Sequence, residues 1–294
     1  METPRLILVP TDLSDAAAHA LRYASGLAER FGAHLLVIHA DVFMPPVDVT
    51  AAAAGVFEFA RQRMIDEATE ALQTHAERNI SSSVPFDVRV IVSEPLAAIV
   101  GQIRESGAEI VVMGTHGRTG VRRLVVGSMT EAVMRRAPVP VIAVNPDAGE
   151  SASVRTVACP VMLTDAGREA LRQAAIIAGP QARFSLLRCV EQPDAHMGAH
   201  DLTRVQMWIP AELRARCDVV LIPSDEHVDE ILQFALAIDA GLIALGIPSE
   251  RTLADSFLGT LAERIVQHSR CPVLTVNALA TQATQRECEP AMVR

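Results

Sequence analysis

The sequence predicts an α/β fold made of two doubly wound, parallel-sheet domains arranged in tandem in a chain of 294 residues. Short apolar segments alternate along the chain with longer segments of helical periodicity. The apolar segments have no polar face, which is typical of parallel strands covered by helices on both sides. The second half repeats the order of segments of the first half, which indicates two copies of one domain.

The first domain is expected over residues 1–147. Its first strand, at 5–10, ends in Pro10 and precedes a helix over 14–33, for which Ser14 is a suitable N-cap and Gly32 a suitable stop. Further strands are expected at 34–40, 86–92, 109–114 and 139–146, and further helices at 56–78, 95–107 and 128–137. This alternation makes one complete α/β domain.

The second domain is expected over residues 154–278. Pro160 matches Pro10 at an offset of 150 residues, whereas Gly246 matches Gly114 at an offset of 132. The second copy therefore lacks 18 residues, and the shortfall lies where the first copy has its long helix. We expect that helix to be lost or shortened. A polar linker is expected around 145–153, and residues 279–294 are expected to form a loose tail.

Composition excludes several classes of function. The net charge of −9 is spread evenly over the two halves, so no basic footprint for nucleic acid is indicated. All 26 basic residues are arginine, which excludes a Walker-type phosphate loop and other mechanisms that need a lysine. The five cysteines show no metal or redox spacing, which predicts buried thiols in a reducing compartment. No signal-peptide core or membrane-length apolar run is present, so we expect a cytoplasmic protein with no membrane partner.

A glycine-rich stretch, GTHGRTGVRRLVVGS at 114–128, follows a buried strand and precedes a helix. Ligands of open α/β sheets bind at this edge, outside the carboxyl ends of the strands. Glycines let backbone N–H groups approach an anion, and Ser128 adds a hydroxyl at the positive end of a helix. The stretch therefore favours a phosphate site, although glycines that merely shape a turn would leave the same pattern.

This stretch, together with LVPTDLSD at 8–15 and VIHADV at 37–42, resembles the universal stress protein family over nearly all of residues 4–146. The resemblance implies a Rossmann-like fold of the adenine nucleotide alpha hydrolase type, with ATP as the ligand. It also implies an adenosine and phosphate site formed by the following residues: Asp12, Ala40, Met113, Gly114, Gly117, Arg118, Gly127, Ser128 and Met129. In this reading Asp12 lies near the adenosine and Ala40 meets the adenine edge.

The alternative role for Asp12 is to cap the following helix, but Ser14 or Asp15 suits that role better and would leave Asp12 free. Arg118 could clamp phosphates, although solvated loop charge is the better interpretation for at least two of Arg118, Arg122 and Arg123. His39 and His116 could act as acid or base, but a histidine beside a turn is more often structural.

No metal site is visible, and any Mg²⁺ would be held mainly by the phosphates of the nucleotide. We therefore expect a binding module without catalytic residues. A slow ATP hydrolase or phosphotransferase, or a binder of AMP or cyclic AMP, remains the alternative.

The second copy departs from the motif. Met162 stands where the first copy has Asp12, and Ser249 stands where it has Gly117, while Gly246, Gly259 and Thr260 remain. We expect a turn that survives without binding ATP. By the same resemblance, the last strands of the two domains, at 139–144 and 271–276, are expected to pair within the chain, as in a dimer. A homodimer of the whole chain is compatible with the sequence but not indicated by it.

Overall fold

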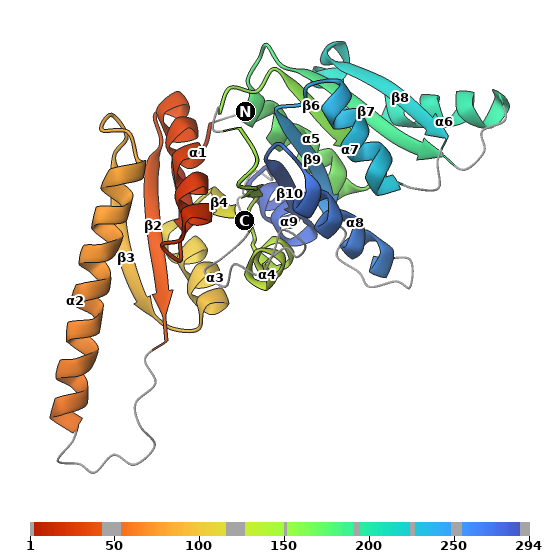
Figure 1. Cartoon of the computed structure of the whole chain (residues 1–294). Helices are drawn as coiled ribbons and strands as arrows, with labels where there is room; N and C mark the ends of the chain where they lie inside the picture. Colours follow the sequence, from red (N-terminus) through yellow and green to blue (C-terminus); the bar gives the residue numbers. More distant parts are fainter. Residues whose placement is uncertain are drawn as a thin grey trace, which may run out of the picture.

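The computed structural model describes residues 3–42, 54–115, 127–149, 152–190, 195–223, 227–247 and 255–288. Within these residues the chain forms a single ten-stranded sheet with helices on both faces (Figure 1). The elements of the first half are β1 (Leu6–Pro10), α1 (Asp15–Phe31), β2 (His34–Asp41), α2 (Ala54–Asn79), β3 (Phe86–Val92), α3 (Pro95–Ser106), β4 (Ile110–Gly114), α4 (Ser128–Arg136) and β5 (Val141–Val144).

Among the described residues, the second half contains the corresponding elements and two added ones, a 3-10 helix and a C-terminal α-helix. They are β6 (Thr156–Pro160), α5 (Asp165–Ala178), β7 (Arg183–Val190), α6 (Ala195–Trp208), the 3-10 helix η2 (Ala211–Arg216), β8 (Cys217–Pro223), α7 (His227–Ala237), β9 (Leu242–Ile247), α8 (Asp255–His268), β10 (Val273–Asn277) and α9 (Ala278–Cys288). The predicted alternation of strands and helices is confirmed in both halves.

The strand order is β3-β2-β1-β4-β5-β10-β9-β6-β7-β8. Pairing is parallel within each half, and the order reverses beside β1 and β6, as a doubly wound sheet requires. The expected pairing of the two last strands is also confirmed, because β5 and β10 run antiparallel with Val141 opposite Thr275. The two halves therefore share one continuous sheet.

Two apolar layers cover the sheet, and each extends through both halves. On one face Ile7 and Val9 pack with α1, α2, α5 and α6, and on the other Leu8 packs with α3, α4, α7 and α8. The strands alternate between these faces, and both faces are buried, which is why the sequence shows strands without a polar side.

The helix boundaries follow the local signals in the sequence. Ser14 is the N-cap of α1, because its hydroxyl accepts the N–H of Ala17 at 3.2 Å. Gly32 ends the same helix in the left-handed conformation, with a φ of 66°. The expected shortening in the second half is also present, since α6 has 14 residues where α2 has 26.

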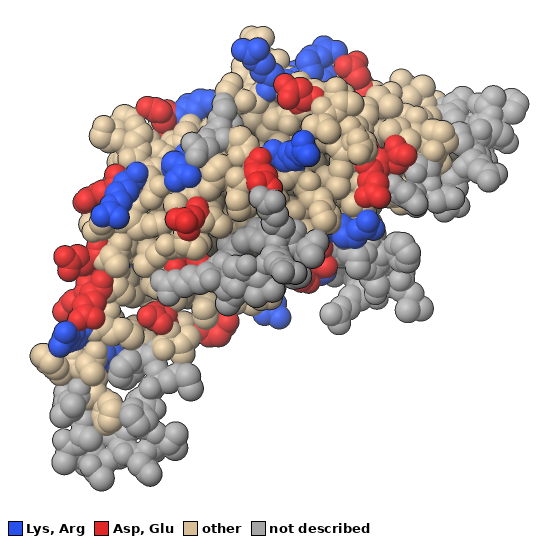
Figure 2. Space-filling model, viewed as in Figure 1, with Lys and Arg blue, Asp and Glu red and all other residues tan. Residues whose placement is uncertain are grey.

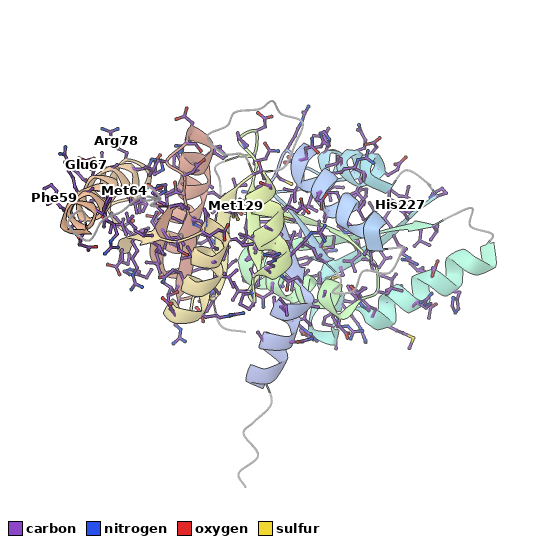
Figure 3. All side chains as sticks on the ribbon, turned by 90° about the horizontal axis from the view of Figure 1, so that it is seen from below. Phe59, Met64, Glu67, Arg78, Met129 and His227 are labelled. Carbon is purple, nitrogen blue, oxygen red and sulfur yellow. The ribbon has the colours of Figure 1, made fainter. Side chains whose placement is uncertain are left out.

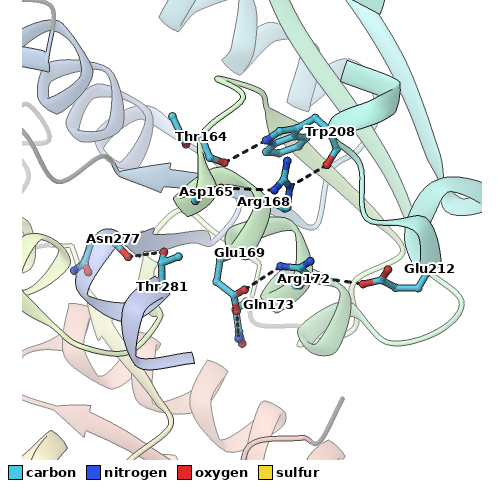
Figure 4. Close-up of polar contacts among 10 residues, drawn as sticks. All are labelled: Thr164, Asp165, Arg168, Glu169, Arg172, Gln173, Trp208, Glu212, Asn277 and Thr281. Atoms are coloured by element: carbon cyan, nitrogen blue, oxygen red, sulfur yellow. Dashed lines mark hydrogen bonds and ion pairs between the residues drawn. The ribbon is translucent and has the colours of Figure 1, made fainter. Parts of the chain in front are cut away.

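The C-terminal segment differs from the loose tail expected after residue 278. Residues 278–288 form α9, whose first turn is capped by Asn277, since the Asn277 side chain accepts the N–H of Ala280 at 2.9 Å. The hydroxyl of Thr281 donates to the carbonyl of Asn277, as Figure 4 shows. Ala280 and Thr281 are buried, so this helix is docked on the second domain.

No helix in the described part of the chain is both long and apolar enough to span a bilayer. On the face drawn in Figure 2, arginine and acidic side chains are interspersed and form no continuous basic area.

Four thiols are free, those of Cys159, Cys189, Cys217 and Cys271. Burial raises the pKa of each.

Candidate functional site

A cavity of about 330 Å³ opens at the carboxyl ends of β1, β2 and β4. Seven of the predicted site residues line it, from four separate segments: Asp12, Ala40, Met113, Gly114, Gly127, Ser128 and Met129. Figure 3 views the molecule from below and shows Met129 on α4 near the middle of the sheet. Gly117 and Arg118 lie outside the described residues, as do His116, Arg122 and Arg123.

The loop after β1 fixes the position of Asp12. Oδ1 of Asp12 accepts the N–H of Ser14 at 3.0 Å. The N–H of Leu13, one residue earlier than Ser14, donates to the hydroxyl of Thr11 at 3.0 Å. Ser14 caps α1 as predicted, but Asp12 is not free as predicted, because one of its oxygens closes this turn. A carboxylate has further acceptor positions, so the turn orients Asp12 without using all of its capacity.

Leu13 adopts the left-handed conformation, with a φ of 66°, which costs a non-glycine residue about 1 kcal/mol. The equivalent Leu163 in the second half has a φ of 54°. The strained turn therefore belongs to the fold of both halves, and the difference between them lies in the side chain at position 12 or 162.

Gly114 and Gly127 have packing reasons to be glycine. A Cβ at Gly114 would lie 3.0 Å from the carbonyl oxygen of Ala16, so the residue lets α1 approach the end of β4. A Cβ at Gly127 would lie 3.2 Å from the carbonyl oxygen of Thr115. These two glycines bring the starts of α1 and α4 to the same edge of the cavity.

The N-terminus of α4 supplies donors for an anion. Gly127 is its N-cap and offers no side-chain bond to the first N–H groups. The hydroxyl of Thr130 donates to the carbonyl of Gly114 at 2.8 Å, which ties the first turn of α4 to the end of β4. The first N–H groups of Ser128 and Met129 therefore lie at the cavity with the positive end of the helix dipole.

The rest of the wall was not among the predicted binding residues, although His39 was considered as an acid or base. Thr11, Ile38, Pro95, Ile99 and Thr130 complete it, together with Pro10, Ala17 and His39. Pro95 and Ile99 come from the start of α3, and the position of that helix after a neighbouring strand end could have indicated them. The wall is mainly apolar, so the cavity suits a flat apolar group beside one acidic and one anion-binding end.

The histidine nearest the cavity is structural, as expected. The ring Nδ1 of His39 lies 2.8 Å from the carbonyl oxygen of Thr11, and His39 is buried. A second histidine, His75 on α2, lies behind the cavity with its Nε2 at 3.4 Å from the hydroxyl oxygen of Thr11. Burial lowers the pKa of His75, although the Asp12 carboxylate opposes the shift.

The equivalent edge of the second domain is closed. The described residues there enclose only about 10 Å³, between side chains that include Met162, Leu245, Leu261 and Ala262. Met162 replaces Asp12, and Leu261 and Ala262 stand at the positions of Met129 and Thr130. The carboxylate of Asp12 and the hydroxyl of Thr130 are therefore replaced by a thioether and a methyl group.

The helix after β9 also differs from the expected turn. α8 begins at Asp255, so Gly259 and Thr260 lie inside the helix instead of at its start. Within a helix, N–H groups beyond the first turn bond to carbonyls four residues earlier and cannot hold a ligand. Ser249 and Pro248 lie outside the described residues.

The short helix α6 closes a further side of this region. The indole N–H of Trp208 donates to the carbonyl of Thr164 at 3.3 Å, and Nε of Arg168 donates to the carbonyl of Trp208 at 3.1 Å (Figure 4). The Trp208 ring also lies 3.4 Å from the position that a Cβ would take at Gly167. The end of α6 is therefore held against the start of α5.

Among the described residues, no group of three or more His, Cys, Asp or Glu side chains is arranged to hold a metal ion. Among the described residues that line the first cavity, Asp12 is the only carboxylate.

Comparison with known proteins gives these features a family context. The sequence profile of the universal stress protein family matches residues 4–145 and 153–277. Universal stress protein MJ0531 of Methanocaldococcus jannaschii is 30% identical over 139 residues, which cover 47% of this chain and 81% of that protein. Universal stress protein E of Escherichia coli K12 is 21% identical over 302 residues, which cover 92% of this chain and 93% of that protein.

Solved structures show the same fold over both halves. The crystal structure of a universal stress protein from Archaeoglobus fulgidus aligns with a TM-score of 0.63 and 17% identity, covering 94% of this chain and 97% of that one. A putative universal stress protein from Pseudomonas aeruginosa aligns with a TM-score of 0.63 and 15% identity, covering 97% of both chains.

Proposed function

Because the chain belongs to the universal stress protein family, with two copies of the family domain, we propose that its first domain binds ATP and acts as a nucleotide-sensing module of the stress response. We take residues 1–147 as the binding domain and 154–278 as its structural partner. One observation carries the proposal: Asp12, Ala40 and Gly127, which lie in three separate segments of the sequence, line one cavity, while the described residues fill the matching edge of the second domain.

The chemistry of the wall suggests how ATP would lie. The adenine ring would pack against the apolar wall that includes Ile38 and Ile99, with its edge near the backbone of Ala40. Asp12 would accept hydrogen bonds from the adenosine, and the N–H groups at Ser128 and Met129 would face the phosphates. Any Mg²⁺ would be held mainly by the phosphates and would offset their charge, and the glycine stretch that contains Gly117 and Arg118 would complete the phosphate side.

Calorimetric titration of the full chain with ATP tests this assignment. We expect one ATP per chain, and two equivalent sites would contradict the inactive second domain. Asp12→Met imports the residue that the second domain already accommodates as Met162, so the fold should persist while ATP affinity falls at least tenfold, or about 1.4 kcal/mol.

Asp15→Asn is the matched control. Asp15 lies three residues after Asp12, in the first turn of α1, and does not line the cavity. The ATP affinity of the Asp15→Asn variant should therefore equal that of the unmodified chain. Gly117→Ser, which copies Ser249, provides a second variant from the phosphate side. An unchanged affinity in both Asp12→Met and Gly117→Ser would reject the site.

Two further measurements distinguish the alternatives within this proposal. Competition of AMP and cyclic AMP against ATP identifies the preferred nucleotide. Single-turnover assays with labelled ATP and Mg²⁺ test hydrolysis or phosphotransfer, and we expect no product above background because the described wall offers only Asp12 to activate water. A cytoplasmic location and a homodimer remain predictions.

A further inference from the structure

A second and larger cavity lies between the two domains, at the edge of the sheet opposite the proposed nucleotide site. Its volume is about 630 Å³. The first domain contributes the end of α1 with Arg30 and Phe31, and the second contributes Arg155 before β6, Gln181 after α5, and Leu213 and Arg216 of η2. In Figure 1 this junction lies beside the label N, between α1 and α5.

Three arginines and no carboxylates stand among the described residues that line this cavity. None of the three forms an ion pair with another described residue. This is unusual in a chain that carries a net charge of −9 and whose other arginines often pair with acids, as Arg183 does with Asp218 at 3.0 Å. A positively charged concave surface of this kind attracts anions.

Two of the guanidinium groups are held in place by backbone carbonyls. Arg216 donates from Nε to the carbonyl of Ala182 at 3.0 Å and from Nη2 to that of Gly179, and its guanidinium lies 5.0 Å from the ring centre of Phe184. Arg30 donates from Nη1 to the carbonyl of Ala152 and stacks at 4.9 Å on Phe31. A guanidinium has five N–H donors, so each group keeps donors for a ligand.

The third arginine has no such structural contact. Arg155 is exposed, and no hydrogen bond or ion pair of its side chain is present among the described residues. Partial desolvation lowers the pKa of Arg30, and the Tyr23 hydroxyl opposes that shift. The carbonyl bonds explain why Arg30 and Arg216 are present, but they do not explain why three cations share one cavity.

We propose that this interdomain cavity binds a small organic phosphate monoester. Its doubly charged phosphate would be held by Arg30, Arg155 and Arg216, since guanidinium groups pair with phosphate oxygens through two parallel hydrogen bonds. Its organic part would pack on Phe31 and Leu213. The volume exceeds that of a phosphate ion alone and lies within the range of small-molecule sites. Because both domains contribute, the ligand would link them.

Calorimetric titration of the full chain with phenyl phosphate tests the proposal. We expect saturable one-to-one binding that weakens as ionic strength rises. Arg155→Gln should weaken binding about tenfold, the effect of one lost charge-assisted contact. Arg104→Gln is the control, because Arg104 lies in the last turn of α3 and does not line the cavity. Equal affinities in Arg155→Gln and Arg104→Gln would overturn the proposal.

Two comparisons define the ligand and the site. Inorganic phosphate should bind more weakly than phenyl phosphate, and equal affinity would remove the organic part of the proposal. Asp12→Met should bind phenyl phosphate as the unmodified chain does. A loss of binding in Asp12→Met with no loss in Arg155→Gln would place phenyl phosphate in the first cavity and reject the interdomain site.

Discussion

Asn145 and Asn277 stand at equivalent ends of β5 and β10, and each donates its side-chain amide to the carbonyl end of a helix in the other domain. Nδ2 of Asn277 lies 2.8 Å from the carbonyl oxygens of both Met134 and Ala137, at the end of α4. Nδ2 of Asn145 lies 3.0 Å from the carbonyl oxygen of Gln267, near the end of α8. The junction is therefore an isologous interface formed within one chain.

These amides satisfy helix carbonyls that have no partner within their own helix. Asn277→Ala should leave two buried carbonyls and the N–H of Ala280 unsatisfied, and should lower the free energy of unfolding by about 1–3 kcal/mol. Asn145→Ala removes one bond of 3.0 Å and one of 3.5 Å, so its effect should be smaller. Urea unfolding of both variants measures the difference, and the reverse order would contradict this account.

A second symmetric pair crosses the same junction. Glu131 and Glu263 occupy equivalent positions on α4 and α8, and Arg135 contacts both, at 3.1 and 2.6 Å. The pKa of Glu263 is raised, first by burial and then by Glu131, although Arg135 opposes the shift. Burial lowers the pKa of Arg135, but its hydrogen bonds to Glu263 and Glu131 outweigh that effect and raise it. For Glu263 the loss of hydration outweighs the ion pair with Arg135.

Glu263 should therefore give the protein a small pH-dependent instability. A carboxyl whose pKa is raised on folding binds its proton more tightly in the folded state, so stability falls as the pH rises from the ordinary value of 4.5 through the raised one. The Glu263→Gln side chain cannot ionise. The free energy of unfolding of this variant, minus that of the unmodified chain, should therefore increase as the pH rises through this window. Thermal unfolding of both proteins at several pH values measures this difference in free energy. A difference that decreases with rising pH would contradict the raised pKa of Glu263.

The sequence predicted the features that local chemistry determines. Ser14 and Gly32 predicted the first helix, and the apolar segments predicted the alternation of strands with helices. The internal repeat located the short helix α6. The features that were missed depend on tertiary contacts. Asn277 carries no local mark of its bonds to α4, and the capping of α9 depends on that same side chain.

In the candidate site, too, some features follow from the sequence and others depend on tertiary contacts. Its residues followed from the family resemblance, and their placement agrees with the rule that strand ends of a parallel sheet meet at one edge. The bond from the N–H of Ser14 to Asp12 was not predicted, because Ser14 alone was expected to act in the turn before α1. The loss of ATP binding in the second domain was expected from Met162 and Ser249, and it stays a prediction. The contributions of Leu261, Ala262 and the early start of α8 to the small volume at this edge were not foreseen, because they depend on how α8 packs against β9.

The glycines at the ends of β4 and β9 allow a graded test of packing. A Cβ at Gly246 would lie 2.1 Å from the backbone nitrogen of Gly167, whereas at Gly114 it would lie 3.0 Å from the carbonyl oxygen of Ala16. Gly246→Ala should therefore destabilise the chain more than Gly114→Ala, and by more than about 3 kcal/mol, the upper range of typical overpacking costs.

Gly101→Ala is the control for both substitutions. Gly101 lies inside α3, and no atom stands within 4 Å of a Cβ built there, so alanine should stabilise the helix by about 0.5–1 kcal/mol. Thermal unfolding of the three variants should give the order Gly101→Ala, Gly114→Ala, Gly246→Ala from most to least stable. A Gly246→Ala variant as stable as Gly114→Ala would show that α5 can shift away from β9.

Thr130 connects stability to the proposed binding of ATP. Its hydroxyl fixes the first turn of α4 to the carbonyl of Gly114 at 2.8 Å, and the second domain has Ala262 at this position. Thr130→Ala should lower the free energy of unfolding by about 1 kcal/mol, because the buried carbonyl loses its donor. It should also weaken ATP binding several-fold, since the N–H groups of Ser128 and Met129 would no longer be held at the cavity.

Thr130→Ser is the control, because it keeps the hydroxyl. It should restore ATP affinity even where the lost methyl group lowers the free energy of unfolding. Denaturant unfolding and ATP titration of the two variants separate these effects, and a serine variant that binds ATP as weakly as the alanine variant would show that the hydroxyl does not position α4.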